Sequence, residues 1–175
     1  MEAGNELTGE LAVDLANTLR PAPDGSVLDL LTDQETRARW LRGTGGPDAI
    51  EPSQLVALRG HARALLDAAV GRRTLPPAAV TAVNQAGAAA PGFAQLEAGE
   101  RVVRYHASPA DAFLADIATS AIGLVGGPER DRLRRCEAPG CGRWFLASRP
   151  RQTWCSPGCG NRARLARFHQ RRRVA

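Results

Sequence analysis

All four cysteines of this 175-residue chain lie within its last forty residues. They are Cys136, Cys141, Cys155 and Cys159, so a C-x4-C pair and a C-x3-C pair are separated by thirteen residues. That span is long enough for a hairpin that brings the two pairs together. Four thiolates can then surround one tetrahedral Zn²⁺ at Zn–S distances of about 2.3 Å. The pattern therefore predicts a small metal-stabilised module at this end of the chain.

Other interpretations of the cysteines stay open on spacing alone. Four thiolates also hold iron–sulfur clusters, although this spacing matches neither ferredoxin pattern. A redox dithiol is more often C-x-x-C, and unrelated buried thiols would not be expected to gather in one short segment. Zinc is favoured because all four positions are thiolates, which leaves none open for water or substrate. We therefore expect one structural Zn²⁺ and no catalytic metal.

Charge is divided sharply along the chain. Residues 1–129 hold 10 arginines against 16 acidic residues, and residues 130–175 hold 13 against 2, which gives net charges of −6 and +11. The chain has no lysine, as a GC-rich coding bias would produce, so the position of the arginines is more informative than their identity. A basic pole that coincides with the cysteines predicts contact with nucleic acid, with a solvated basic tail as the alternative.

The segment that follows Cys159 is predicted to form a helix through Gln170 or beyond. At about 100° per residue, Arg164, Arg167 and Arg171 fall within about 60° of one another and form a row of positive charge. The predicted nucleic-acid contacts are Arg162, Arg164, Arg167, Arg171 and Arg172. Whether they contact phosphates or guanine edges does not follow from the sequence. Trp144, Phe145 and Trp154 are expected to form the small core of the module, with base stacking by Trp144 as the alternative.

The rest of the chain predicts a mainly α fold with a small β-hairpin. Apolar periodicity and turn residues predict helices over 7–19 and 28–41, a third capped by Ser53, a fourth that opens at Pro76 or Pro77, and a fifth capped by Ser108. A change of period predicts a hairpin over 93–106. We expect a helical domain over residues 1–130 and the four-cysteine module, a hairpin followed by a helix, over 131–175.

The same features indicate where the protein works. The amino terminus is acidic and has no apolar stretch behind a basic start, so we expect no secretory signal. The longest charge-free run, over 74–96, is interrupted by prolines, and we expect no membrane span. We therefore expect a cytoplasmic location, in which thiols stay reduced and are available to a metal.

Two stretches resemble known families. Residues 155–162, CSPGCGNR, resemble the signature of the CGNR zinc-finger family, and residues 11–18, LAVDLANT, resemble the opening motif of the ABATE domain. The resemblance implies zinc on Cys136, Cys141, Cys155 and Cys159, DNA binding by the finger, and signal sensing by the ABATE part of a transcription regulator. One departure is Ala147, which stands where family members often carry an acidic residue.

Two sets of polar residues allow more than one role. Asn161 is expected to bond to backbone groups around the zinc site, while Arg162 either contacts phosphate or braces the sulfurs. Asp14, Asn17 and Thr18 form a polar arc beside the leucines of the first predicted helix. We expect this arc to brace neighbouring segments, with a ligand pocket between helices as the alternative.

These observations predict a DNA-binding transcription regulator whose amino-terminal domain is a candidate sensor of a small molecule and which is a candidate homodimer. The alternative is a zinc-stabilised interaction module for an acidic partner such as the transcription machinery. We expect no enzyme, because the chain shows no Ser-His-Asp set or phosphate loop and lacks the histidines that an HNH-type nuclease would need in the finger. The DNA target, the ligand and the direction of regulation do not follow from the sequence.

Overall fold

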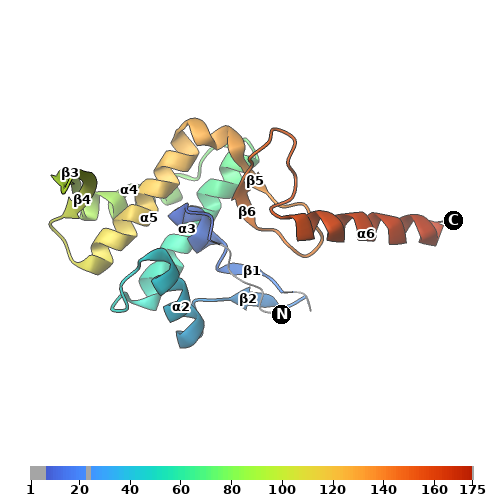
Figure 1. Ribbon diagram of the computed structural model, residues 1–175, viewed down its shortest axis with the longest axis horizontal. Coiled ribbons are helices and arrows are strands. Elements are labelled where there is room, and N and C mark those ends of the chain that lie inside the picture. The colour runs from blue at the N-terminus through green and yellow to red at the C-terminus, as the bar shows by residue number, and fades with distance from the viewer. Residues whose placement is uncertain (1–6, 23–24, 175) are drawn as a thin grey trace.

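In the part of the chain that the structure describes, a helical body carries three short hairpins, and the last helix projects away from it (Figure 1). The structure is a computed structural model that describes residues 7–22 and 25–174. Its elements are α1 (Leu11–Ala16), β1 (Leu19–Pro21), β2 (Val27–Asp29), α2 (Gln34–Thr44), α3 (Pro52–Val70), α4 (Pro77–Ala89), β3 (Gly92–Glu97), β4 (Glu100–Tyr105), α5 (Pro109–Gly126), the 3₁₀ helix η1 (Pro128–Arg132), β5 (Leu133–Arg135), β6 (Trp144–Leu146) and α6 (Pro157–Val174). This is the predicted mainly α fold, ending in a hairpin and a helix.

The core of the body lies among α1, α3, α4 and α5, which pack on one another. Leu55, Leu58, Leu65 and Leu66 of α3 are buried there, as their helical spacing predicts. By length and composition alone, α5 is also apolar enough to cross a membrane, although it carries Asp111 and Asp116 and so is not a charge-free run. Phe113, Ile117 and Leu124 of α5 belong to the buried core, although Ile122 is 44% exposed, so the central place of α5 in the body accounts for much of its apolar composition.

The first two predicted helices both begin too early, and the first also ends too late, whereas α2 continues three residues past the predicted end. The Thr18 hydroxyl donates to the Leu15 carbonyl at 2.7 Å just after α1, and the chain then enters β1, which pairs antiparallel with β2. The Leu30 amide donates to the Thr18 carbonyl at 2.9 Å and continues this pairing. Helix α2 begins only after Asp33, whose carboxylate accepts the Thr36 amide at 2.9 Å as an N-cap. Polar side chains that cap backbone groups therefore override the leucine periodicity.

Further along the chain, the capping and turn residues predicted one helix start and one hairpin correctly. Ser108 caps α5 by accepting the Asp111 amide at 3.1 Å, as predicted, whereas α3 begins at Pro52 after Glu51, so the predicted Ser53 cap is wrong. The predicted hairpin is β3 paired with β4. Its turn residues Ala98 and Gly99 have φ of 49° and 87°, the positive values of a tight turn whose twist matches the strands.

The carboxy-terminal segment packs directly against the helical body. Leu133 of β5 and Trp144 of β6 are buried in the same core as α1, α3 and α5. A second, smaller core holds the four cysteines together with Phe145, Ala147 and Ala163. The domain boundary at residue 130 stays a prediction. The strand pair β5 and β6 contributes residues to both cores and so connects them.

Candidate metal centre and basic helix

The four cysteines meet at one point. Cys136 follows β5, Cys141 lies in the loop before β6, Cys155 precedes α6, and Cys159 is in its first turn. Their sulfur atoms all lie within 4.8 Å of one another. The sulfur–sulfur distances are 3.7 Å for Cys141 to Cys155, 3.5 Å for Cys155 to Cys159 and 3.7 Å for Cys159 to Cys141. The hairpin thus brings both pairs together, as their spacing predicts.

This geometry fits a tetrahedral ion. A metal at about 2.3 Å from four sulfurs places neighbouring sulfurs about 3.8 Å apart, whereas a disulfide needs about 2.05 Å. Three of the observed separations match the edge of such a tetrahedron. All four positions are thiols, so one Zn²⁺ here would crosslink β5, β6 and α6 and leave no coordination position for a substrate. The site is suited to one structural zinc ion.

The closeness of the sulfurs also changes their acidity. The hydrogen bond from the Cys155 thiol lowers the pKa of Cys141 to about 4, and the same contact raises the pKa of Cys155. Burial raises the pKa of Cys136. Four thiolates this close repel one another, so a divalent cation is what lets all four ionise together.

Donors surround the cluster and offset its charge. The Cys155 amide donates to the Cys136 sulfur at 3.4 Å, and Arg162 Nη2 donates to the Cys159 sulfur at 3.2 Å. Zinc with four thiolates would carry a formal charge of about −2, which the guanidinium of Arg162 partly compensates. Arg20 of β1 and Arg143 line a cavity of about 310 Å³ on the same side of the cluster. Of the two roles considered for Arg162, the structure shows the contact to sulfur.

Asn17 binds the strand that carries the metal module. Its Oδ1 accepts the Trp144 amide and its Nδ2 donates to the Trp144 carbonyl, both at 3.0 Å and both buried. The other edge of β6 is paired with β5, where the Cys136 amide donates to the Arg143 carbonyl at 2.7 Å and the Ala147 amide to the Arg132 carbonyl at 2.8 Å. The Asn17 amide therefore takes the place of a further strand at the open edge of β6.

The Trp144 ring completes this attachment. It is 1% exposed and lies in the core of the helical body. The guanidinium carbons of Arg63 and Arg135 lie 4.5 and 4.8 Å from the ring centre, and Arg135 also pairs with Asp67 of α3 at 2.9 Å. Trp144 thus belongs to the large core and not to the small one, and its burial leaves no face for stacking on a base. This corrects both roles considered for it.

The other members of the polar arc are also bound within the protein. Asp14 is buried and accepts from the Thr8 amide at 2.7 Å and from its hydroxyl at 2.9 Å; burial raises the pKa of Asp14 despite these bonds. The Thr18 hydroxyl accepts from Arg59 Nη1 at 3.0 Å. Arg59 is itself buried and makes a two-point ion pair with Asp29 of β2, with Nη2 to Oδ2 at 2.7 Å.

Arg59 and Arg63 were missed by sequence reasoning. Arg59 lies on the apolar face of α3, four residues after Leu55, and a charge at that spacing is a usable signal for a buried ion pair. Arg63 donates to the Ala16 carbonyl at 2.7 Å at the end of α1. No local pattern marks that contact, because it joins residues 47 positions apart.

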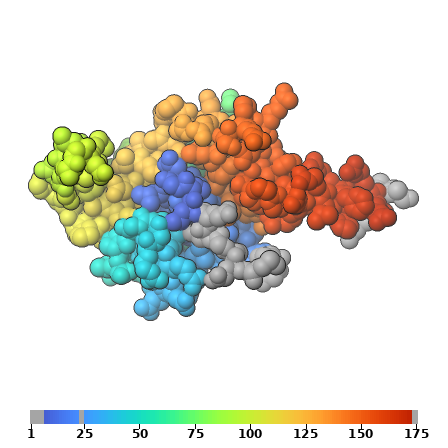
Figure 2. Space-filling model, in the orientation of Figure 1, coloured from blue at the N-terminus to red at the C-terminus, as the bar shows by residue number. Residues whose placement is uncertain are grey.

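Helix α6 presents the predicted arginines to solvent. Its start lies near β1 and β2, and its far half leaves the metal module as a rod that the space-filling view shows as a projection (Figure 2). Arg167 lies over the Trp154 ring at 5.6 Å, and Arg172 over the Phe168 ring at 5.1 Å. Within the described chain, no carboxylate pairs with the arginines of this set, which are Arg162, Arg164, Arg167, Arg171 and Arg172.

Asn161 and Gly160 have separate roles in the signature. Asn161 is exposed and accepts a hydrogen bond from the Arg164 guanidinium, so the predicted bonds to backbone around the cysteines are wrong. Gly160 faces the Trp154 ring, and a Cβ there would lie 3.2 Å from Trp154 Cε3. The glycine therefore lets α6 approach the ring closely.

Comparison with known families agrees with this organisation. The model of the ABATE family, described as "Putative stress-induced transcription regulator", matches residues 9–128, and that of the CGNR zinc finger matches residues 132–172. No curated protein matches the chain. The first match alone covers more than half of the 175 residues. The chain belongs to the ABATE family and carries a CGNR zinc finger behind the ABATE domain.

Proposed function

We propose that this protein is a transcription regulator that binds DNA through α6, while zinc holds the start of that helix. The observation that carries the proposal is the set of exposed arginines on α6, which has no acidic partner in the described chain and contributes to the +11 charge of residues 130–175. Such a surface attracts polyanions at long range and releases counterions from phosphates on binding. The description of the ABATE family agrees with a role in regulation.

The dimensions of α6 support a groove-binding role. Its 18 residues make a rod about 27 Å long and about 10–12 Å across with side chains, and the major groove of B-DNA is about 12 Å wide. Cys159, Gly160 and Ala163 are buried against the module, while the side chains of residues 167–172 are exposed. The far half of the helix is therefore accessible to a duplex.

Salt-dependent binding tests the proposal. Labelled duplex is titrated at several salt concentrations with the wild type and with Arg164, Arg167 and Arg171 changed together to Ala. Each lost phosphate contact lowers the slope of log affinity against log salt by about 0.9, so the triple variant should lose up to about 2.7. Arg42, Arg73 and Arg101, exposed arginines of the ABATE domain, changed together to Ala provide a control of equal charge. A helix variant that binds like this control would contradict the proposal.

Further parts of the proposal have their own tests. We propose further that the protein is cytoplasmic, that it is not an enzyme and that it acts as a homodimer. We also propose that its ABATE domain receives a small-molecule signal. A palindromic operator with half-sites about one helical turn apart would support the dimer. Cleavage of duplex DNA by metal-loaded protein in the presence of Mg²⁺ would contradict the non-enzymatic assignment.

An acidic protein partner is the second candidate, and one observation favours it. Leu165 and Phe168 of α6 are 59% and 48% exposed, so the basic helix also offers apolar contacts that a duplex would not need. Binding to a partner would then weaken when Leu165 and Phe168 are changed to Ser, while the salt slope on DNA would stay unchanged. Loss of DNA affinity in that variant would instead assign these side chains to the DNA surface.

A further inference from the structure

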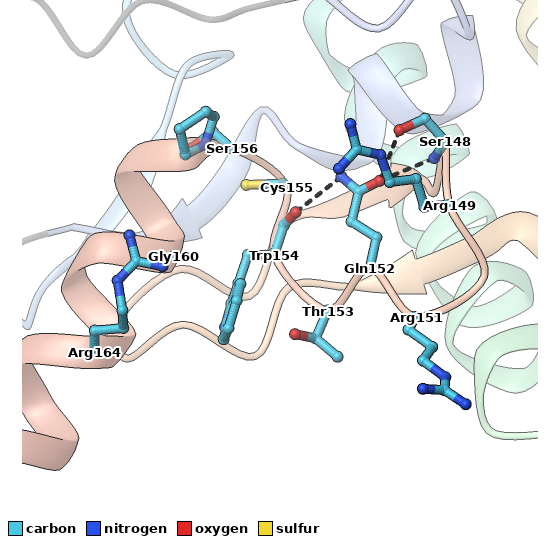
Figure 3. Close-up of a pocket in the computed structure, with 11 residues that line it drawn as sticks. Ser148, Arg149, Arg151, Gln152, Thr153, Trp154, Cys155, Ser156, Gly160 and Arg164 are labelled. Carbon is cyan, nitrogen blue, oxygen red and sulfur yellow. Dashed lines mark hydrogen bonds between the residues drawn. The ribbon is translucent and has the colours of Figure 1, made fainter.

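A second basic surface lies beside the cysteines, outside the row of arginines on α6. It is a cleft of about 560 Å³ between the segment 148–154, here called the arginine loop, and the start of α6 (Figure 3). Arg149 and Arg151 line it from the loop and Arg164 lines it from the helix. None of its lining residues is acidic, and Thr153 and Ser156 add hydroxyl groups.

The arginine loop is held in shape by one side chain. Gln152 Oε1 accepts the Ser148 amide at 2.9 Å and the Ser148 hydroxyl at 3.0 Å, while its Nε2 donates to the Trp154 carbonyl at 3.0 Å (Figure 3). A backbone bond from the Gln152 amide to the Arg149 carbonyl at 3.1 Å tightens the same turn. The fold of the loop thus does not depend on the side chains of Arg149 and Arg151, which are exposed.

The charges of the cleft are not compensated. Several arginines elsewhere are paired with carboxylates, as in Arg59 with Asp29, Arg132 with Glu129 and Arg135 with Asp67. Over the described residues, Arg149 and Arg151 have no such carboxylate partner, and Arg164 is bonded to the neutral amide of Asn161. Guanidinium groups and hydroxyls on a fixed loop, with no nearby carboxylate, form a site for a phosphate group.

Arg164 joins this cleft to the row on α6. It lines the cleft and also begins the row that continues through Arg167 and Arg171, which rises about 10 Å along the helix. We propose that the cleft holds backbone phosphate of a duplex whose strand runs along this row and into the arginine loop. The inference rests on the proposed DNA binding and adds a second contact region, supplied by the zinc module itself.

The test compares two pairs of arginines. Arg149→Ala with Arg151→Ala is set against Arg42→Ala with Arg101→Ala, which removes the same charge from exposed sites in the ABATE domain. If two phosphate contacts are lost, the salt slope falls by about 1.8, so the loss of affinity between 50 and 200 mM salt becomes about tenfold smaller than for the wild type. The control pair should change the slope by less than half of that amount. Each protein is first checked for one bound zinc per chain.

The outcomes separate this inference from the function on which it rests. A reduced slope in the loop pair but not in the control pair supports the cleft. A wild-type slope in the loop pair, with a reduced slope in the Arg164, Arg167 and Arg171 variant, overturns the cleft and leaves helix binding intact. A wild-type protein that does not bind duplex overturns both.

Discussion

The bond between Asn17 and the backbone of Trp144 gives the sharpest prediction about stability. Asn17→Ala removes both halves of a buried pair and leaves the Trp144 amide and carbonyl without partners. Each unsatisfied buried group costs about 1–3 kcal/mol, and water entering the space left by the amide recovers part of this. We therefore expect a loss of about 2–4 kcal/mol in the free energy of unfolding.

The measurement is urea unfolding of the zinc-loaded protein, followed by tryptophan fluorescence because Trp144 is the side chain most directly released. Asn161→Ala is the matched control, since Asn161 is exposed and lies on α6. It should change the free energy of unfolding by less than about 0.5 kcal/mol, as exposed substitutions usually do. Equal stability of the Asn17 and Asn161 variants would refute the idea that this amide fixes the metal module to the ABATE domain.

Three other predictions address the ion pair, the signature glycine and the metal. Arg59→Met should destabilise the protein by about 2–4 kcal/mol, since it leaves Asp29 without its partner. The hydrogen bond from Arg59 lowers the pKa of Asp29 in the folded protein, so the ion pair stabilises the fold above the pKa that Asp29 has in the unfolded chain. This stabilisation is lost as the pH falls through the pKa of Asp29 in the folded protein. Unfolding measured below about pH 4 should therefore show a loss of stability in the wild type that is missing from the variant. Gly160→Ala should cost about 1–3 kcal/mol by pressing a Cβ on Trp154, whereas Gly158→Ala, with its nearest neighbour at 3.8 Å, should be neutral or slightly stabilising in thermal melts. Metal analysis should find one zinc per colourless chain, and Cys136→Ser should lose that zinc together with the folded module; a coloured, iron-containing protein would contradict the assignment.

The sequence was most informative where the chemistry is local. Four thiols at fixed spacing predicted the cluster, and Ser108 before Pro109 predicted the start of α5. The arginines of α6 could be placed on one helix, because helical geometry fixes the angles between them. These features depend on neighbours within a few residues or on a metal that needs all four ligands.

What the sequence did not disclose depends on contacts between distant segments. Asn17 and Trp144 are 127 positions apart, and their bond explains why Trp144 joins the large core. The leucines of residues 7–19 fit a helix, but the capping by Thr18 and the pairing with Leu30 shorten it. The arginine loop could not be predicted from the sequence, because Arg149 and Arg151 line a common cleft only when Gln152 bonds to Ser148 and Trp154 and fixes the shape of the loop.

The projection of α6 has a mechanical consequence. Among the described residues, the buried positions of α6 lie in its first two turns, so the helix acts as an arm about 27 Å long with its fixed end at the cysteines. A tilt of about 10° at that end moves the tip by about 5 Å, which exceeds the rise of about 3.4 Å per base pair along DNA. The stiffness of the joint made by Asn17, Trp144 and the four sulfurs therefore determines whether the arm can hold one register on a duplex or drifts to the next.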